Sequence, residues 1–376
     1  MNTTTSDIQH PTSDIDDLAR YHRQMLLPGF GEEGQRKLLA SKALIVGCGA
    51  LGTVAANLLA RAGVGELIIV DRDFIEATNL QRQVLFDEND VRDAIPKAEA
   101  AKRKINQINS QVKVTAIVDD LNHTNIEKLA EGCDVLVDGV DNFETRFIVN
   151  DAAVKLGIPY VYGGAVGTVG MQYTILPHTP AGDSPWEKVG KATPCLRCIF
   201  EQAPPPGMNP TCDTAGVLNT SVGIVATYEA NEALKLLTGN WDAVSPTLLH
   251  IDTWHNLVKQ FKVGKAYDLG ECVCCKKRSF EFLDGKFGSS TTTLCGRNAV
   301  QLQQKESSGG KLDFDEIAGR LRSHGDVTAN KFMLRANITD NGEPYELTLF
   351  TDGRAIVKGT QKPDVARGIY AKYVGA

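Results

Sequence analysis

The stretch KALIVGCGALG, residues 42–52, decides the fold class of this chain. It begins with an apolar run of strand length, and Gly47, Gly49 and Gly52 then form the pattern Gly-x-Gly-x-x-Gly. These glycines allow a tight turn and let backbone N–H groups approach a phosphate at the start of the next helix. Asp71 ends the next apolar run, about 20 residues on, where an acidic residue binds ribose hydroxyls. The segment predicts a strand–loop–helix unit that binds a nucleotide.

Short apolar runs and amphipathic helical patterns alternate from Arg20 to about Gly170. Strands are expected at Ala43–Gly47, Leu67–Asp71, Val112–Val118, Val135–Val140 and Tyr160–Tyr162, and helices at 51–63, 96–109, 124–131 and 143–157. This alternation predicts an α/β fold: a Rossmann-like, mostly parallel sheet with helices on both faces. Beyond it we expect a strand at Val169–Leu176, an ordered crossover excursion at Thr179–Pro210 and a long helix at Gly216–Leu237.

The domain organisation follows from shifts in composition. Residues 1–17 carry too little apolar surface to fold and are expected to be a disordered tail. Residues 18–287 are expected to form the nucleotide-binding domain. Residues 288–376 are expected to form a small C-terminal α+β domain. Its expected elements are a helix at Phe314–Leu321, a strand at Lys331–Asn337, a hairpin of Tyr345–Thr351 and Ala355–Lys358 that turns at Asp352-Gly353, and a helix at Pro363–Val374.

Composition limits the class of protein. The chain has 376 residues, and 40 basic against 46 acidic side chains give a net charge of −6, which argues against a nucleic-acid surface. Its apolar runs are too short to cross a membrane, and its polar N-terminus does not resemble a signal peptide. We therefore expect a cytoplasmic protein. Nine cysteines in such a chain favour metal ligands over a disulfide framework.

Residues that follow Asp71 favour phosphate chemistry over hydride transfer. Asn79, Arg82 and Gln83 come shortly after it, and Lys97 lies further along the chain. An NAD-dependent oxidoreductase shares the glycine loop but needs no such set of groups near the diphosphate. Transfer of a nucleotidyl group does need them, because charge develops on the α-phosphate and on the departing pyrophosphate.

A series of motifs in order resembles one known family. The series comprises Arg20-Tyr-His-Arg23-Gln24, the GCGALG loop, Asp71-Arg-Asp73, Asn79-Leu-Gln-Arg82-Gln83, Pro96-Lys97, Asp138-Gly-Val-Asp141-Asn142, CLRC and TCDTAGVL. Over residues 18–283 it resembles the ThiF, MoeB and HesA group of sulfur-carrier-protein adenylyltransferases, relatives of ubiquitin-activating enzymes. Two positions depart from the family pattern: Ala50, where many members have a second adjacent glycine, and Ala94-Ile95, where Gly-Gln or similar is usual.

The resemblance implies a reaction and its participants. A small β-grasp carrier protein ending in Gly-Gly would be adenylated on its C-terminal carboxylate by ATP and Mg²⁺, giving an acyl-adenylate and pyrophosphate for later thiocarboxylate formation. Asp71 would hold the ribose, Asn79, Arg82 and Lys97 the phosphates, and Asp141 would help to position Mg²⁺. Asp138 would only complete its strand. The full set of expected nucleotide-binding residues is Gly47, Gly49, Ala50, Gly52, Asp71, Asp73, Asn79, Arg82, Gln83, Lys97, Asp141 and Asn142.

The resemblance also implies partners. Arg23 would enter the neighbouring subunit's ATP site, which makes the expected enzyme a homodimer. A cysteine desulfurase or another sulfur donor would be a further partner.

Two Cys-x-x-Cys pairs predict a structural zinc site. Cys195 and Cys198 form the first pair, and Cys272 and Cys275 form the second. Four thiolates complete a closed tetrahedral Zn²⁺ site. Cys274 could replace a neighbour as ligand, but the spacing of Cys272 and Cys275 mirrors that of the first pair. The alternatives are accidental pairs or one redox Cys-x-x-Cys.

Other cysteines have different expected roles. Cys212 precedes the long helix, where the pKa of a thiol falls, so it is a candidate nucleophile that would form a thioester or acyl-disulfide. Thioester formation there with a ubiquitin-like modifier is the alternative to simple adenylation. Cys48 and Cys133 are expected to be packing residues. For the C-terminal domain we consider a docking platform for the carrier and a sulfur relay through Cys295. Neither the carrier nor its pathway follows from the sequence.

Overall fold

The computed structural model describes residues 18–201, 215–286, 291–294, 298–302, 314–340, 342–351 and 354–374. The predicted tail, Cys212, Cys295, the turn Asp352-Gly353 and the predicted boundary near residue 288 lie outside these ranges. Among the described residues, no helix combines the length and the apolar character that a membrane span requires.

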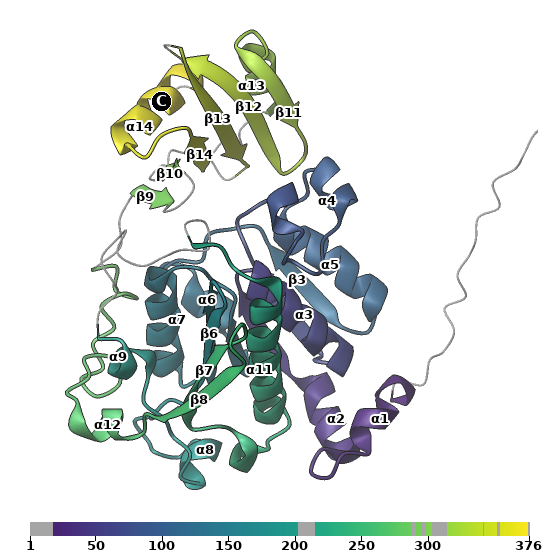
Figure 1. Ribbon diagram of the computed structural model, residues 1–376, viewed down its shortest axis with the longest axis vertical. Coiled ribbons are helices and arrows are strands. Elements are labelled where there is room, and N and C mark those ends of the chain that lie inside the picture. Colours follow the sequence, from purple (N-terminus) through teal and green to yellow (C-terminus); the bar gives the residue numbers. More distant parts are fainter. Residues whose placement is uncertain are drawn as a thin grey trace, which may run out of the picture.

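One eight-stranded sheet lies at the centre of the larger part of the molecule (Figure 1). Its strands follow the order β3-β2-β1-β4-β5-β6-β7-β8. Its strands are β1 (Lys42–Val46), β2 (Glu66–Val70), β3 (Lys113–Ile117), β4 (Val135–Asp138), β5 (Tyr160–Val166), β6 (Val169–Ile175), β7 (Thr247–Asp252) and β8 (Leu257–Lys262). The pairs among β1 to β5 are parallel, and β6, β7 and β8 extend the sheet with antiparallel pairs. This confirms the predicted Rossmann-like α/β fold.

The helices of this part cover both faces of the sheet. They are α1 (His22–Met25), α2 (Gly31–Ala40), α3 (Ala50–Ala62), α4 (Glu88–Arg92), α5 (Lys97–Ile108), α6 (Ile126–Ala130), α7 (Phe143–Leu156), α8 (Pro185–Lys188), α9 (Leu196–Ile199), α11 (Asn219–Leu237) and α12 (Lys265–Leu269), with 3-10 turns η1 (Ala19–Tyr21), η2 (Ala77–Asn79) and η3 (Trp241–Ala243). Side chains that alternate along β1 enter two cores. Ala43 and Ile45 pack with α3, α5 and α11, whereas Leu44 and Val46 pack with α6 and α7.

The second sheet builds the C-terminal domain, in the order β11-β12-β13-β14-β10-β9 with antiparallel pairs. Its elements are β9 (Thr291–Leu294), β10 (Ala299–Leu302), α13 (Phe314–Leu321), β11 (Gly325–Ala329), β12 (Met333–Asp340), β13 (Glu343–Phe350), β14 (Ala355–Lys358) and α14 (Pro363–Tyr373). The predicted hairpin of β13 and β14 is confirmed by their antiparallel pairing.

Two predicted element bounds are corrected. The long helix begins at Asn219 rather than Gly216, because Gly216 has φ +72°, which an α-helix does not adopt. The strand expected at Val135–Val140 ends at Asp138, because the Asp138 side chain accepts a hydrogen bond from the backbone N–H of Val140 and turns the chain.

Three glycines pack backbone against backbone where β1 meets α3. Gly47 has φ +85°, which favours glycine. A Cβ on Gly52 would lie 2.0 Å from the carbonyl oxygen of Gly47, and a Cβ on Gly139, just after β4, would lie 2.2 Å from the same oxygen. No side chain fits at these contacts, so β1, α3 and the end of β4 shape the glycine loop together.

Candidate nucleotide-binding site and cysteine centre

The glycine loop holds the predicted ribose acid in place. The backbone N–H of Cys48 donates to Asp71 Oδ2 at 2.6 Å, and the N–H of Asp73 donates to Asp71 Oδ1 at 2.7 Å. Burial raises the pKa of the Asp71 carboxyl, although the ammonium of Lys97 and both N–H donors favour its charged form. The structure therefore brings Asp71 to the glycine loop, just before the start of α3.

Lys97 and Asp73 form a second pair beside this acid. Lys97 is the first residue of α5 and only 3% exposed, and its Nζ lies 3.0 Å from Asp73 Oδ2. Its backbone N–H donates to the carbonyl oxygen of Asp73 at 2.9 Å. Ala94, in the turn before α5, has φ +48°, an unusual conformation for a residue other than glycine. This turn fixes the buried ammonium next to two carboxylates.

The segment that follows β2 carries three of the residues expected to bind the nucleotide, and their side chains lie in three different surroundings. Asn79 is buried and its Oδ1 accepts from the backbone N–H of Glu76 at 3.0 Å, so its side chain caps η2. Arg82 is half-buried, and its Nη1 donates to the carbonyl oxygen of Thr78 at 2.9 Å. Gln83 is 3% exposed, and among the described residues its Oε1 has no hydrogen-bond partner. Asn79 thus shapes the turn that carries Arg82 and Gln83.

Asp141 and Asn142 lie at the start of α7. Asp141 is exposed, whereas Asn142 Oδ1 accepts from the backbone N–H of Thr145 at 2.9 Å and caps the helix. Asp138, expected only to complete its strand, is buried and paired: its Oδ2 lies 3.2 Å from Arg146 Nε and accepts from the Tyr160 hydroxyl at 2.6 Å. Asp138 therefore anchors α7 beneath the exposed Asp141.

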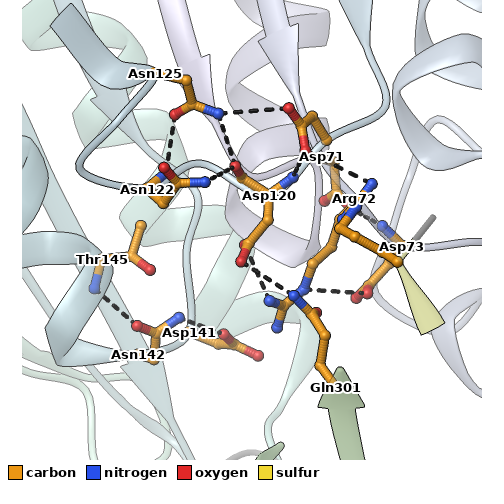
Figure 2. A network of polar contacts seen from close by, with 12 residues as sticks. Asp71, Arg72, Asp73, Asp120, Asn122, Asn125, Asp141, Asn142, Thr145 and Gln301 are labelled. Carbon is orange, nitrogen blue, oxygen red and sulfur yellow. Dashed lines mark hydrogen bonds and ion pairs between the residues drawn. The ribbon is translucent and has the colours of Figure 1, made fainter. Parts of the chain in front are cut away.

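Arg72 is a residue that the sequence analysis missed. Its Nη1 lies 2.9 Å from Asp120 Oδ1 and its Nε lies 3.8 Å from Asp73 Oδ1 (Figure 2). Although burial opposes charge on Arg72, Asp120, Asp73, Asp141 and Asp71 raise its pKa. Only its position in the sequence Asp-Arg-Asp could have indicated that Arg72 forms ion pairs with carboxylates at this site.

Arg23 lies outside this constellation. It is exposed on α1, at the end of the domain opposite the C-terminal domain (Figure 1). The structure does not bring Arg23 together with the glycine loop of its own chain, and Cys212 lies outside the described residues.

Glu229 on α11 is a buried acid that no sequence pattern identified. It is fully buried, and among the described residues neither carboxyl oxygen has a hydrogen-bond partner. Its carboxyl group packs on Gly163, where an added Cβ would lie 2.2 Å from the carboxyl carbon. Burial raises the pKa of Glu229 well above its usual range, and nearby Asp138 adds to the shift while Arg146 opposes it.

The Glu229→Gln variant should change the pH dependence of stability. Above the ordinary pKa of 4.5 the unfolded chain loses this proton while the folded chain keeps it, so stability falls as pH rises towards the folded pKa. Glutamine has no proton to lose in this range. Between pH 4.5 and the folded pKa, the free energy of unfolding of the variant should therefore rise by about 1.4 kcal/mol per pH unit relative to the parent. Urea unfolding from pH 5 to pH 8 measures the difference. A difference that does not change with pH would show that Glu229 titrates normally.

Four cysteines form a compact cluster on the face covered by α7. The Sγ atoms of Cys195, Cys198, Cys272 and Cys275 all lie within 4.8 Å of one another. The Cys195–Cys198, Cys195–Cys272 and Cys198–Cys275 separations are 3.9, 3.6 and 3.3 Å. A tetrahedral site with Zn–S bonds of about 2.3 Å requires sulfur atoms about 3.8 Å apart. The cluster therefore has the dimensions of a four-thiolate metal site.

Neighbouring side chains support the cluster. Asn150 on α7 accepts from the backbone N–H of Leu196 at 2.8 Å, and its Nδ2 donates to Cys274 Sγ at 3.3 Å. Cys274 is fully buried and outside the group of four, which agrees with the predicted choice of Cys272 and Cys275. Cys48 and Cys133 are buried free cysteines, as predicted for packing residues.

The structure is a Rossmann-like domain in which buried Lys97 pairs with Asp73 beside the glycine loop, with a four-cysteine cluster on the face covered by α7. Comparison with known proteins identifies the family to which this domain belongs. Residues 21–274 match the ThiF family, and the chain belongs to that family.

Individual relatives agree with this membership. The Bacillus subtilis protein named sulfur carrier protein ThiS adenylyltransferase is 41% identical over 357 residues, 95% of this chain and 99% of the relative. The Thermus thermophilus sulfur carrier protein adenylyltransferase is 39% identical over 237 residues, 63% of this chain and 84% of the relative. The crystal structure of Escherichia coli MccB with ATP is 26% identical, covers 68% of this chain and 74% of MccB, and has a TM-score of 0.54.

Proposed function

We propose that this protein is an ATP-dependent adenylyltransferase that activates the C-terminal Gly-Gly carboxylate of a small β-grasp sulfur-carrier protein. The pairing of buried Lys97 with Asp73, next to the backbone-held Asp71, carries the proposal for nucleotide chemistry. Similarity over nearly the full length to a protein named as a ThiS adenylyltransferase supports the choice of substrate. The carrier carboxylate attacks the α-phosphate, and pyrophosphate leaves.

The geometry supports the following proposed roles for the residues of the site. Asp71 binds the ribose, and the N–H groups at the glycine loop face the phosphates. Lys97 and Arg82 neutralise the charge that develops on the phosphates. Exposed Asp141 supplies an oxygen ligand of the kind that Mg²⁺ prefers. Asn79 and Asn142 shape the segments that carry these groups, and buried Gln83 stays a proposed nucleotide-binding residue.

A homodimer is proposed because Arg23 is remote from the glycine loop of its own chain. The α1 segment that carries Arg23 is followed by Leu26 and Leu27, which are 68% and 57% exposed. Exposed leucines beside a cation that lacks a role in its own subunit suit a contact with a second copy. Arg23 then acts in the site of the neighbouring subunit.

The edge strand β8 is the proposed docking position for the carrier. It ends the large sheet, and all six of its residues are exposed. Leu257, Val258 and Phe261 give it apolar surface, and Trp254 is exposed in the turn before it. An unpaired strand edge with apolar side chains can bind a strand of a small β-protein.

Zinc is the proposed ion for the four-cysteine cluster, because four thiolates at tetrahedral separations suit Zn²⁺. The ion joins the segment around α9 to the segment after α12. Cys212 remains a proposed acceptor for covalent transfer, a cysteine desulfurase or other sulfur donor is the proposed later partner, and the cytoplasm is the proposed location. We also propose residues 18–287 and 288–376 as the two domains.

ATP–pyrophosphate exchange with purified protein and a panel of Gly-Gly-ending carriers tests the function. We expect exchange that requires Mg²⁺ and one carrier of the panel. The same carrier without its terminal Gly-Gly should support none. A protein that neither binds ATP nor catalyses exchange with any carrier would contradict the proposal.

A further inference from the structure

The C-terminal domain packs directly on the loop that carries the nucleotide site. Phe74, three residues after Asp71, packs with Met333 and Phe350 of the C-terminal domain, and all three are buried. The ring centroids of Phe74 and Phe350 lie 5.7 Å apart. This buried apolar contact joins the C-terminal domain to the loop that follows β2.

Polar contacts from the same domain reach the segments on either side of the site. Arg354 is 3% exposed, donates to the carbonyl oxygen of Val118 at 3.3 Å and lies 3.7 Å from a carboxylate oxygen of Asp119. Asn330 Nδ2 donates to the carbonyl oxygen of Ala94 at 3.0 Å. The C-terminal domain thus holds the chain just before Asp120 and just before Lys97.

A continuous series of contacts leads from Gln301 of the C-terminal domain to Asp73 (Figure 2), and Asp73 in turn pairs with Lys97. Gln301 Nε2 on β10 donates to Asp120 Oδ2 at 3.3 Å, and Asp120 Oδ1 lies 2.9 Å from Arg72 Nη1. Arg72 Nε lies 3.8 Å from Asp73 Oδ1, and Asp73 Oδ2 lies 3.0 Å from Lys97 Nζ. Five side chains from distant parts of the sequence therefore form one series.

Gln301 stands out among the residues at this domain contact. It is 3% exposed, and among the described residues its Oε1 has no hydrogen-bond partner. Burying an amide with one unsatisfied oxygen lowers stability, and such groups call for a functional explanation. The hydrogen bond from Gln301 to Asp120 gives a functional reason for burying this amide.

We propose that the C-terminal domain positions the phosphate-directed Lys97, acting through Gln301, Asp120, Arg72 and Asp73. Gln301 is a positioning residue, because it orients Asp120 and does not act on the reacting atoms. The inference rests on the proposed function, since it gives Lys97 a phosphate to bind.

Charge balance explains how the series works. Asp73 lies between two cations, Arg72 and Lys97. While Asp120 holds Arg72 near Asp73, the carboxylate of Asp73 is shared, and Lys97 keeps positive potential for phosphate oxygens. When Gln301 no longer orients Asp120, the Asp120 carboxylate can move away from the site. Arg72 stays paired with Asp120 and moves away from Asp73. Lys97 then pairs with Asp73 alone and attracts ATP less strongly.

The Gln301→Met variant tests this inference, because methionine keeps the length and packing of the side chain but cannot donate to Asp120. We expect the KM for ATP in carrier-dependent exchange, and the Kd for ATP, to rise about tenfold, as for loss of a hydrogen bond to a charged group. The KM for the carrier should not change. A loss of folded protein would lower the rate but would leave the KM values for both ATP and the carrier unchanged.

Matched variants complete the experiment. Gln361→Met makes the same change at an exposed glutamine of the C-terminal domain and should match the parent. Arg72→Met removes the cation that shares Asp73, so Lys97 pairs with Asp73 alone. The KM for ATP should rise by at least about tenfold, and adding Gln301→Met to this variant should change nothing further.

Three outcomes would overturn the inference: an unchanged KM for ATP in folded Gln301→Met, additive effects in the double variant, or no effect of Arg72→Met. The third outcome does not depend on Gln301→Met, so the test still decides the question when that variant does not fold. A parent protein without ATP binding or exchange would instead contradict the proposed function.

Discussion

Replacement of Lys97 by methionine should lower carrier-dependent ATP–pyrophosphate exchange by at least about 100-fold, as for loss of one group that stabilises developing charge. Lys97 is 3% exposed and fixed 3.0 Å from Asp73, so its charge is already oriented before ATP binds. A preorganised, desolvated cation stabilises phosphate charge more strongly than a solvated one. The rate is measured with saturating ATP and carrier.

The Lys102→Met variant is the control for this prediction. Lys102 lies on the same helix, α5, and is half-buried, so the substitution tests the loss of a lysine without touching the pair with Asp73. It should keep nearly full activity. Thermal unfolding of both variants separates loss of activity from loss of fold. Exchange reduced less than tenfold in folded Lys97→Met would show that other groups bind the phosphates.

Replacement of Cys198 by serine should remove the bound metal and lower Tm by about 10 °C or more, because metal binding to such sites contributes directly to folding. The cluster brings the segment around α9 next to the turn that contains Cys272 and Cys275, and a bound metal would join the two. These segments belong to the core over α7, where Cys195, Leu196 and Leu283 are buried. Loss of one ligand therefore loosens a whole face of the large sheet.

Metal content and calorimetry check this prediction together. The purified parent should hold about one zinc per chain by elemental analysis, and Cys198→Ser should hold almost none. Cys133→Ser, at a buried cysteine outside the cluster, should retain the zinc. A parent without bound metal, or a Cys198→Ser variant as stable as Cys133→Ser, would argue against a structural metal site.

The parallel part of the fold could be predicted from sequence because each strand carries its own signal. β1 and β2 are short apolar runs with four buried residues each, and helical patterns separate them. The strand β8 gave no such signal, because all six of its residues are exposed and apolar and polar types are mixed. Its place in the sheet depends on pairing with β7 rather than on burial.

The site was predictable only where its residues lie close in sequence. Asp71, Asp73 and Lys97 follow the glycine loop at recognisable spacings, and the structure brings them together. Gln301 and Asp120 meet because two domains pack against each other, and no local pattern records that contact. Glu229 was hidden for another reason: it lies in the middle of a long helix and belongs to no motif of the sequence analysis.

The packing of Gly47, Gly52 and Gly139 limits how far the loop can be treated as a transferable unit. Gly139 lies just after a different strand, β4, yet the space for its side chain is occupied by the Gly47 carbonyl oxygen. Residues 42–52 grafted onto another parallel sheet would carry the familiar pattern without this third glycine. A larger residue at that place in the recipient would push the loop out of shape. Protein engineers who move this nucleotide loop between scaffolds must therefore move a residue nearly ninety positions away with it.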